Sequence, residues 1–220
     1  MRRMIELALA VALAFAPLGA RAADASEAER LATLLALKPG MRVAEIGAGE
    51  GDLAFEMAER VGLGGRVFAT ELAGDDLYAL RRRVKFGVVT NLTVVTAQLS
   101  ATGLAAGCCD AIYLRNVYHH LTDPSAIARD IQRALVPGGT LVVIDFPPTW
   151  YLVPFSPDGV GEERTGHGIT PEAALRELES AGFERVQVIE SWSDRWFVGD
   201  VYALVLRAPA TGAAPDRARE

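Results

Sequence analysis

The chain alternates between short apolar runs and segments in which apolar residues recur every three or four positions. Short apolar runs bounded by turn residues are typical of buried strands, and the longer spacing is typical of helices with one apolar face. The apolar runs predict strands at 43–46, 66–70, 91–95, 109–114, 141–145, 186–189 and 201–206. The periodic segments predict helices at 25–37, 53–61 and 75–85, a fourth that begins at Asp123 or Ser125 and ends at 134, and a fifth at 171–180. Ser26 and Thr170 are the expected N-caps of the first and the fifth. Strands and helices in alternation predict an α/β domain.

The first predicted strand runs directly into a glycine-rich turn and then into a helix. The strand ends with Glu45 and an isoleucine, and the turn contains Gly47, Ala48, Gly49 and Gly51. Glycine permits unusual backbone angles and lets a ligand approach the main chain closely. The helix that follows offers free N–H groups at its start, and open α/β sheets bind ligands at this edge. The sequence therefore predicts a ligand site at this turn.

The spacing of these glycines argues against a dinucleotide. The dinucleotide fingerprint is G-x-G-x-x-G, which leaves room for a pyrophosphate at the start of the helix. Here the pattern is G-x-G-x-G, and Asp52 stands where the third glycine would be, so its carboxylate would repel a pyrophosphate. Glu45 better suits a ligand with a cationic or ammonium group. The chain also contains no Tyr-x-x-x-Lys pair, and these features exclude an NAD-dependent oxidoreductase.

The second predicted strand ends on an acid, Glu71. A carboxylate at this position can accept hydrogen bonds from both hydroxyls of a ribose. Glu71 lies 20 residues after Gly51, the offset expected within a βαβ unit. The alternative is that Glu71 caps a helix or lies exposed in a loop. We expect the ribose role because the acid follows a strand in the same unit as the glycine turn.

Composition narrows the class of partner. Half of the 220 residues are hydrophobic, which is enough for a sizeable core, and the net charge is -6. An acidic chain of this kind is not expected to bind a nucleic-acid backbone. Cys108 and Cys109 are adjacent and cannot close an ordinary disulfide loop. We expect them to be small buried residues at the entry to a strand.

Residues 1–22 have the features of a secretory signal peptide. Arg2 and Arg3 precede an apolar run at 5–18, and Ala20-Arg21-Ala22 is a cleavage pattern. We expect an exported, periplasmic or secreted domain at 23–207, which meets the membrane only through the leader before cleavage; N-terminal sequencing of the natural protein tests this. The alternatives are an uncleaved membrane anchor and an amphipathic helix on the domain. The tail 208–220 is expected to be disordered.

Three motifs resemble those of the class I S-adenosylmethionine-dependent methyltransferases. Residues 37–51 contain Leu-Lys-Pro-Gly-Met-Arg-Val and then Glu-x-Gly-x-Gly-x-Gly, which resembles motif I of that family. Residues 116–121, Asn-Val-Tyr-His-His-Leu, resemble motif IV of the ubiquinone-biosynthesis-like small-molecule group, also called methyltransferase type 11. Residues 135–139, Leu-Val-Pro-Gly-Gly, resemble the turn before the family's fifth strand. Together the motifs cover about residues 37–146 in the family's order.

The resemblance implies a fold, a cofactor and a reaction. The implied fold is a Rossmann-like, doubly wound seven-stranded sheet that is mostly parallel with an antiparallel last strand. The implied cofactor is S-adenosylmethionine, whose methyl group passes to a small-molecule acceptor by in-line displacement. Such a reaction mainly requires alignment and exclusion of water, so a catalytic base is optional.

The resemblance also implies roles for particular residues. Glu45 and the glycine turn would hold the methionine end of the cofactor, and Gln98 would contact its adenine. Arg115 and Asn116 would lie over its carboxylate or over the reacting centre. The expected cofactor-binding residues are Glu45, Gly47, Ala48, Gly49, Gly51, Glu71, Leu72, Gln98, Leu99, Arg115 and Asn116.

All three histidines fall in loops expected at the same edge of the sheet: His119, His120 and His167. We expect His119 to be a substrate-facing acid–base group, and the alternative is a structural role for these rings. A metal site made of His119, His167 and Glu162 or Glu163 has no ligand spacing to support it, so the sequence predicts no metal.

A long irregular segment at 146–170 precedes the last predicted helix. A loop of this length within a compact domain is usually functional or mobile. Aromatic residues in and after it either line an apolar substrate pocket or close the core: Trp150, Tyr151, Phe155, Trp192 and Trp196.

The main alternative function is an exported, non-catalytic domain that binds S-adenosylmethionine, S-adenosylhomocysteine or another ligand on the same fold. The predicted leader motivates this alternative, because S-adenosylmethionine is made in the cytoplasm and an exported domain would be separated from it. An uncleaved leader would also separate the two, since Arg2 and Arg3 would hold the N-terminus inside and place the domain outside. The presence of Glu45, the glycine turn and Glu71 favours a working cofactor site.

Overall fold

The computed structural model describes residues 25–149, 167–195 and 199–210. The predicted leader and most of the predicted tail lie outside the described residues, as do Trp150, Tyr151, Phe155, Trp196, Glu162 and Glu163. Among the helices that the structure describes, none has the length and apolar character needed to cross a membrane.

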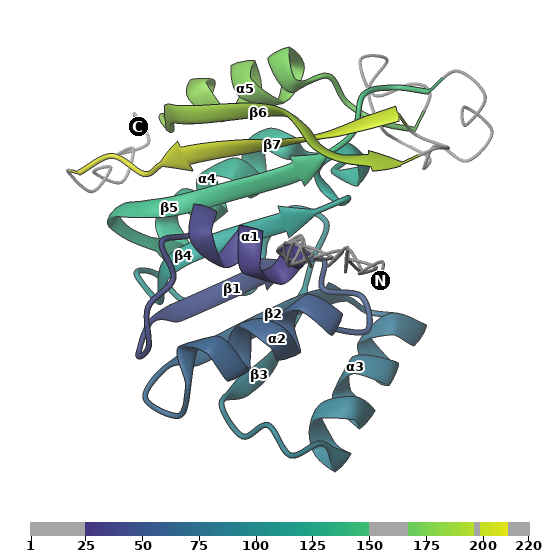
Figure 1. The fold of residues 1–220 in the computed structure, drawn as a ribbon, viewed down its shortest axis with the longest axis vertical. Coiled ribbons are helices and arrows are strands. Elements are labelled where there is room, and N and C mark those ends of the chain that lie inside the picture. Colours follow the sequence, from purple (N-terminus) through teal and green to yellow (C-terminus); the bar gives the residue numbers. More distant parts are fainter. Residues whose placement is uncertain (1–24, 150–166, 196–198, 211–220) are drawn as a thin grey trace, which may run out of the picture.

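Seven strands of the described chain form one sheet in the order β3-β2-β1-β4-β5-β7-β6 (Figure 1). The strands are β1 Arg42–Ile46, β2 Arg66–Leu72, β3 Leu92–Ala97, β4 Cys109–Arg115, β5 Leu135–Asp145, β6 Glu184–Arg195 and β7 Gly199–Arg207. Strands β1 to β5 pair in parallel, whereas β7 is antiparallel to both β5 and β6. The predicted Rossmann-like sheet with an antiparallel last strand is confirmed.

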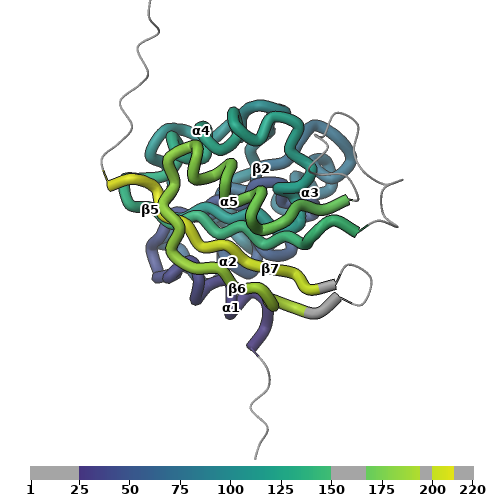
Figure 2. The backbone as a smooth tube through the Cα atoms, turned by 90° about the horizontal axis from the view of Figure 1, so that it is seen from above, coloured from purple at the N-terminus to yellow at the C-terminus, as the bar shows by residue number. Residues whose placement is uncertain are grey.

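Helices cover both faces of this sheet. They are α1 Glu27–Leu34, α2 Asp52–Val61, α3 Asp75–Phe86, α4 Pro124–Ala134 and α5 Pro171–Ser180. Successive strand residues point to opposite faces, so Val43 packs into the core under α1 to α3 while Ala44 packs into the core under α4 and α5. Figure 2 shows α1 and α4 on opposite sides of the sheet. Burial on both faces explains the nearly continuous apolar runs that predicted the central strands.

Several element boundaries differ from the prediction, most of all those of β5 and β6. Strand β5 begins at Leu135 because this residue pairs with Cys109 before the Pro-Gly-Gly turn interrupts the register. Strand β6 is longer than expected because it follows β7 through two irregularities in register. The 3₁₀ turn η1, Tyr118–His120, was not predicted from the sequence, since three residues are too short for a periodic signal.

The start of α2 differs from the starts of α1, α4 and α5. Ser26, Asp123 and Thr170 cap those three helices with side-chain oxygens, as the sequence predicts for Ser26 and Thr170. Helix α2 has Gly51 at this position, in the left-handed region with φ 88° and no side-chain cap. Helix α2 therefore begins without a side-chain cap, directly after the glycine turn at the carboxyl edge of the sheet.

The adjacent cysteines lie at the opposite edge, where β4 begins. Cys109 is buried and Cys108 is half-buried, so the expected small residues at a strand entry are found there. Next to them, Arg42 of β1 makes an ion pair with Asp110 of β4 at 2.7 Å. This end of the sheet is thus tied by side chains that take no part in the cavity described below.

Candidate functional site

A cavity of about 450 Å³ opens at the carboxyl ends of β1, β2, β3 and β4. A volume of this size is within the range of ligand pockets. Its wall includes every residue of the predicted cofactor-binding set. Further lining residues are Ile46, Glu50, Asp52, Leu53, Asp76, Ala97, Ala101, Thr102, Val117, His120, Leu121, Thr122 and Ile127. The structure therefore brings together residues from the first glycine turn to the loop after β4.

The glycine turn forms one side of the cavity, and its three glycines all have positive φ: 68° at Gly47, 55° at Gly49 and 88° at Gly51. A Cβ on Gly47 would lie 2.6 Å from Val117 Cγ2. A Cβ on Gly49 would meet nothing within 4 Å. Close packing thus requires glycine at position 47, whereas the backbone at position 49 faces open space.

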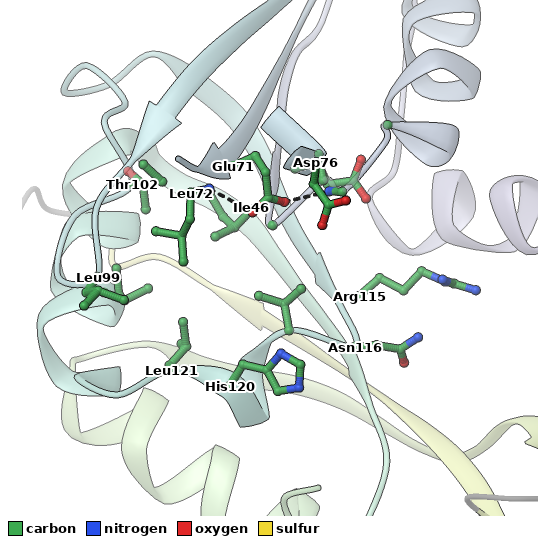
Figure 3. Close-up of a pocket in the computed structure, with 18 of the residues that line it drawn as sticks. Ile46, Glu71, Leu72, Asp76, Leu99, Thr102, Arg115, Asn116, His120 and Leu121 are labelled. Carbon is green, nitrogen blue, oxygen red and sulfur yellow. Dashed lines mark hydrogen bonds between the residues drawn. The ribbon is translucent and has the colours of Figure 1, made fainter. Parts of the chain in front are cut away.

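Glu71 spans the space between the turn and the end of β2. Its Oε2 accepts the N–H of Gly49 at 2.7 Å, and its Oε1 accepts the N–H of Leu72 at 2.8 Å (Figure 3). These two bonds hold both carboxylate oxygens at the cavity wall. The acid is neither a helix cap nor a free loop residue, because it is fixed against the glycine turn.

Glu45 lies deeper, at the end of β1, with 4% of its surface exposed. Tyr113 Oη donates a hydrogen bond to its Oε2 at 3.1 Å. Burial raises the pKa of Glu45 to about 8, although the Tyr113 hydrogen bond and the charge of Arg115 oppose this rise. A buried acid of this kind gains most from a ligand that brings a positive charge.

Acids dominate the charged part of the wall. They are Glu45, Glu50, Asp52, Glu71 and Asp76. Among the described lining residues, Arg115 is the one arginine or lysine, and Glu27 of α1 pairs with it through two hydrogen bonds of 2.8 and 2.7 Å. The cavity therefore suits a cation that carries hydrogen-bond donors, and it disfavours a pyrophosphate.

Arg115 and Asn116 were expected over a carboxylate or over the reacting centre. Both line the cavity, and Figure 3 shows their side chains extending to the same side, away from Leu72, Leu99 and Leu121. The Glu27 pair fixes the Arg115 guanidinium, and Asn116 has a left-handed backbone with φ 56°. Asparagine tolerates this conformation better than most residues do.

Gln98 and Leu99 lie on the wall just beyond β3. The backbone of Gln98 pairs with that of Ala101, with its N–H donating to the Ala101 carbonyl at 2.8 Å. Leu99 is largely exposed at the tip of this turn. An exposed leucine on the cavity wall would gain from contact with an apolar ligand. The adenine contact expected of Gln98 stays a prediction.

His119 does not occupy the substrate-facing position expected for it. Its ring is 2% exposed and absent from the cavity wall, because Asp145 accepts from its Nδ1 at 2.7 Å and from its backbone N–H at 3.1 Å. The neighbouring His120 lines the cavity instead. Desolvation lowers the pKa of His120 to about 4, and the nearby rings of His119 and His167 add to this effect.

Trp192 is the described member of the predicted aromatic group, and it belongs to the core. It is buried, its indole N–H lies 3.4 Å from Glu27 Oε1, and the Arg30 guanidinium stacks 3.9 Å from its ring centre. Trp192 therefore belongs to the closed core and not to an apolar substrate pocket.

Two residues of this region, Glu27 and Asp145, were not identified from the sequence, and His120 was named there while the substrate-facing role was given to His119. Asp145 ends β5, and the rule that found Glu71 at the end of β2 could have found it. The pairing of Glu27 with Arg115 joins positions 88 apart, and no local pattern signals such a contact.

Comparison with known proteins agrees with this geometry. Residues 44–143 match a family described as a methyltransferase domain. The ubiquinone/menaquinone biosynthesis C-methyltransferase UbiE of Shewanella frigidimarina is 32% identical over 112 residues, which are 50% of this chain and 45% of that protein. The UbiE of Shewanella oneidensis is 31% identical over 110 residues, 50% of this chain and 44% of that protein. The chain thus matches less than half the length of these relatives.

Solved structures with the same fold include proteins with different named activities. A SAM-dependent methyltransferase from Aquifex aeolicus has a TM-score of 0.67 at 21% identity, covering 82% of this chain and 89% of that one. The [4+2]-cyclase SpnF has a TM-score of 0.68 at 17% identity, covering 84% and 80%. The fold alone therefore does not fix the reaction.

Residues 44–143 thus resemble a methyltransferase domain, and the fold of the chain is shared with a solved SAM-dependent methyltransferase.

Proposed function

We propose that this chain transfers a methyl group from S-adenosylmethionine to a small-molecule acceptor by in-line displacement. The observation that carries the proposal is the pair of acids at the ends of adjacent strands, Glu45 and Glu71, on either side of a left-handed glycine turn. A cavity with this charge and this open backbone fits a donor that carries an ammonium group, a sulfonium and a ribose.

Different residues of the described chain would hold different parts of the donor. Glu45 would hold the ammonium group, since a buried carboxyl needs a cationic partner to ionise. Glu71 would accept the ribose hydroxyls, because each of its oxygens keeps acceptor capacity beyond the one N–H that it binds. Gly49 leaves the main chain open for close approach. When bound, the donor supplies an electrophilic methyl carbon.

The remaining wall would align the acceptor and keep water out. Ile46 and Leu121 line the cavity together with His120 (Figure 3). Holding two reactants aligned in an apolar enclosure is the main requirement of such a displacement. His120 is neutral near pH 7 because its pKa is about 4, which makes it a weak base; its ring would accept a hydrogen bond at the cavity wall without removing a proton.

Ligand selectivity provides the direct test. We expect S-adenosylmethionine and S-adenosylhomocysteine to bind in the micromolar range, corresponding to about 8 kcal/mol, and NAD not to bind. The acidic wall is the reason, because it attracts the ammonium group and repels a pyrophosphate. Calorimetry with the three ligands measures this, and binding of NAD alone would contradict the proposal. A gain of one methyl group by an acceptor, followed by mass spectrometry, then distinguishes an enzyme from a non-catalytic binder.

Glu71→Ala is expected to weaken S-adenosylhomocysteine binding at least about tenfold, since charge-assisted hydrogen bonds are worth roughly 1.5–3 kcal/mol each. Glu50→Ala is the matched control, because it removes the same charge from an exposed position on the same wall. Circular dichroism establishes that both variants are folded. Equal affinities for Glu71→Ala and the unaltered chain would assign Glu71 to support of the glycine turn alone.

A further inference from the structure

Three histidine rings come together beside the cavity, outside the residues assigned to the methyl donor. One ring nitrogen each from His119, His120 and His167 lies within 4.8 Å of the other two. The ring centres of His119 and His120 are 4.0 Å apart, and His167 lies 4.8 Å from the first ring and 5.1 Å from the second. Two of the rings come from the η1 turn and the third from the segment before α5, so the fold creates the cluster.

Asp145 determines which nitrogen of His119 faces the cluster. The Asp145 carboxylate is buried and accepts the His119 backbone N–H, the Phe146 N–H at 2.9 Å, and the His119 ring at Nδ1. A carboxylate accepts hydrogen bonds, so Asp145 favours the His119 tautomer that has its N–H at Nδ1 and its lone pair at Nε2. In metal sites, ligating histidines almost always donate their other N–H to a carboxylate or a carbonyl in this way.

The lone pair of His119 Nε2 has no hydrogen-bond donor among the described residues, although the atom is buried. Leaving a buried acceptor without a partner normally costs about 1–3 kcal/mol. A cation at the centre of the three rings would satisfy this atom. The unpaired nitrogen and the carboxylate behind it are two separate features, and both indicate a cation as the ligand.

His167 is held at the cluster by its backbone. It has φ 52°, in the left-handed region that few residues other than glycine adopt. The next residue, Gly168, is packed so tightly that a Cβ would lie 2.6 Å from the Pro147 carbonyl oxygen. The N–H of Ile169 then binds the Phe146 carbonyl at 2.9 Å. Strained conformations of this kind persist where the surrounding structure enforces them, and they gather at functional sites.

We propose that His119, His120 and His167 bind one zinc ion through their ring nitrogens, with Asp145 orienting His119. Neutral imidazole favours zinc and neighbouring transition metals over magnesium or calcium. Three protein ligands with a fourth position left open is the arrangement of catalytic zinc sites. Zn–N bonds of about 2.0–2.1 Å place tetrahedral ligand nitrogens about 3.3 Å apart. The three nitrogens lie within 4.8 Å of one another, so zinc binding would draw them together by up to about 1.5 Å.

The open position would face the methyl-transfer cavity, because His120 belongs to both the cluster and the cavity wall. Water or an anionic oxygen or sulfur atom would occupy it. The zinc site itself does not depend on the proposed methyl transfer, so it can be measured without a methyl donor.

The test uses the full chain, stripped of metal with a chelator and titrated with zinc chloride by calorimetry. We expect one zinc ion per chain, and a loss of affinity of at least a hundredfold in His120→Ala and in His167→Ala. Asp145→Asn should lose about 10–100-fold, as is typical when the carboxylate behind a ligating histidine is replaced. Cobalt(II) in place of zinc should give the intense visible absorption of a four- or five-coordinate site, absent in the histidine variants.

Cys108 and Cys109 provide the matched control, because cysteine thiolates also bind zinc. Cys108→Ser should bind zinc as the unaltered chain does. The proposal is overturned by a chain that binds no zinc, by histidine variants that bind it equally well, or by loss of binding in Cys108→Ser. If His167→Ala fails to fold, His120→Ala decides, because the His120 side chain is exposed. S-adenosylhomocysteine binding, measured on the same samples, keeps this result separate from that of the donor site.

Discussion

Gly47→Ala is expected to lower the free energy of unfolding by about 2–5 kcal/mol and to abolish measurable binding of S-adenosylhomocysteine. Two costs combine at this position. A non-glycine residue in the left-handed region costs roughly 1–2 kcal/mol, and forcing a methyl group into a packed site costs roughly 1–3 kcal/mol. Gly47 has φ 68°, and its added Cβ would lie 2.6 and 2.7 Å from the two Cγ atoms of Val117. Urea denaturation and calorimetry measure the two effects.

Two further variants separate strain from crowding at the turn. Gly49→Ala introduces alanine at a similar φ of 55° but into open space, so only the smaller, conformational cost is expected. Val117→Ala removes the two Cγ atoms and leaves the Val117 Cβ at 3.2 Å, so the double variant Gly47→Ala/Val117→Ala should recover most of the steric part of the loss. If Gly47→Ala and Gly49→Ala destabilise the chain equally, the contact with Val117 has no energetic role.

Local patterns were sufficient to predict most of the fold. Ser26 and Thr170 were identified as helix caps from their positions before periodic apolar residues, and both cap helices in the structure. The glycine turn and Glu71 were located because a βαβ unit places both at the same sheet edge, about 20 residues apart. These predictions hold because each depends on residues that are close in the chain or on adjacent parallel strands.

The features that the sequence did not predict depend on contacts between distant segments. The ring of His119 points away from the cavity because of Asp145, 26 residues later, and no periodic pattern encodes that pair. The Arg115 guanidinium is paired with Glu27 on α1. The sequence of α1 predicts which face of the helix is buried, but it does not predict the partner of Glu27. His167 reaches the other two histidines because β5 packs against η1 and the Ile169 N–H binds the Phe146 carbonyl just after β5. Each of these needs the assembled fold.

Glu45→Gln is expected to remove the pH dependence of donor binding. The pKa of Glu45 is about 8 in the free protein, so the group carries a proton near neutral pH and must lose it to face an ammonium ion. Affinity for S-adenosylhomocysteine should therefore rise from about pH 6 to about pH 7.5, by up to about tenfold per pH unit. The upper limit stays below the ordinary α-amino pKa of about 7.7–8.0, which keeps the ligand cationic. Calorimetry in buffers of different ionisation enthalpy should detect proton release by the unaltered chain and none by Glu45→Gln.

Glu45→Gln should also increase the stability of the free protein, although it removes the carboxylate that the ammonium group needs. The folded pKa of about 8 lies above the ordinary value of 4.5, so the folded chain binds more protons than the unfolded chain between these pH values. The stability contributed by protonated Glu45 is fully present below about pH 4.5 and is lost as the pH rises through about 8. Glutamine does not titrate, so from about pH 4.5 to about pH 8 Glu45→Gln should gain stability relative to the unaltered chain, by at most about 5 kcal/mol.

This pair of effects distinguishes a binding role for Glu45 from a structural one. A carboxyl that costs stability when the cavity is free, and strengthens binding when a cation enters, is retained for its ligand. Glu56→Gln on α2 is the matched control, because Glu56 is exposed and should follow the unaltered chain at every pH. Urea denaturation at the two ends of the pH range measures the difference. Parallel pH profiles for Glu45→Gln and the unaltered chain would mean that Glu45 ionises normally, and the ammonium role would then lose its physical basis.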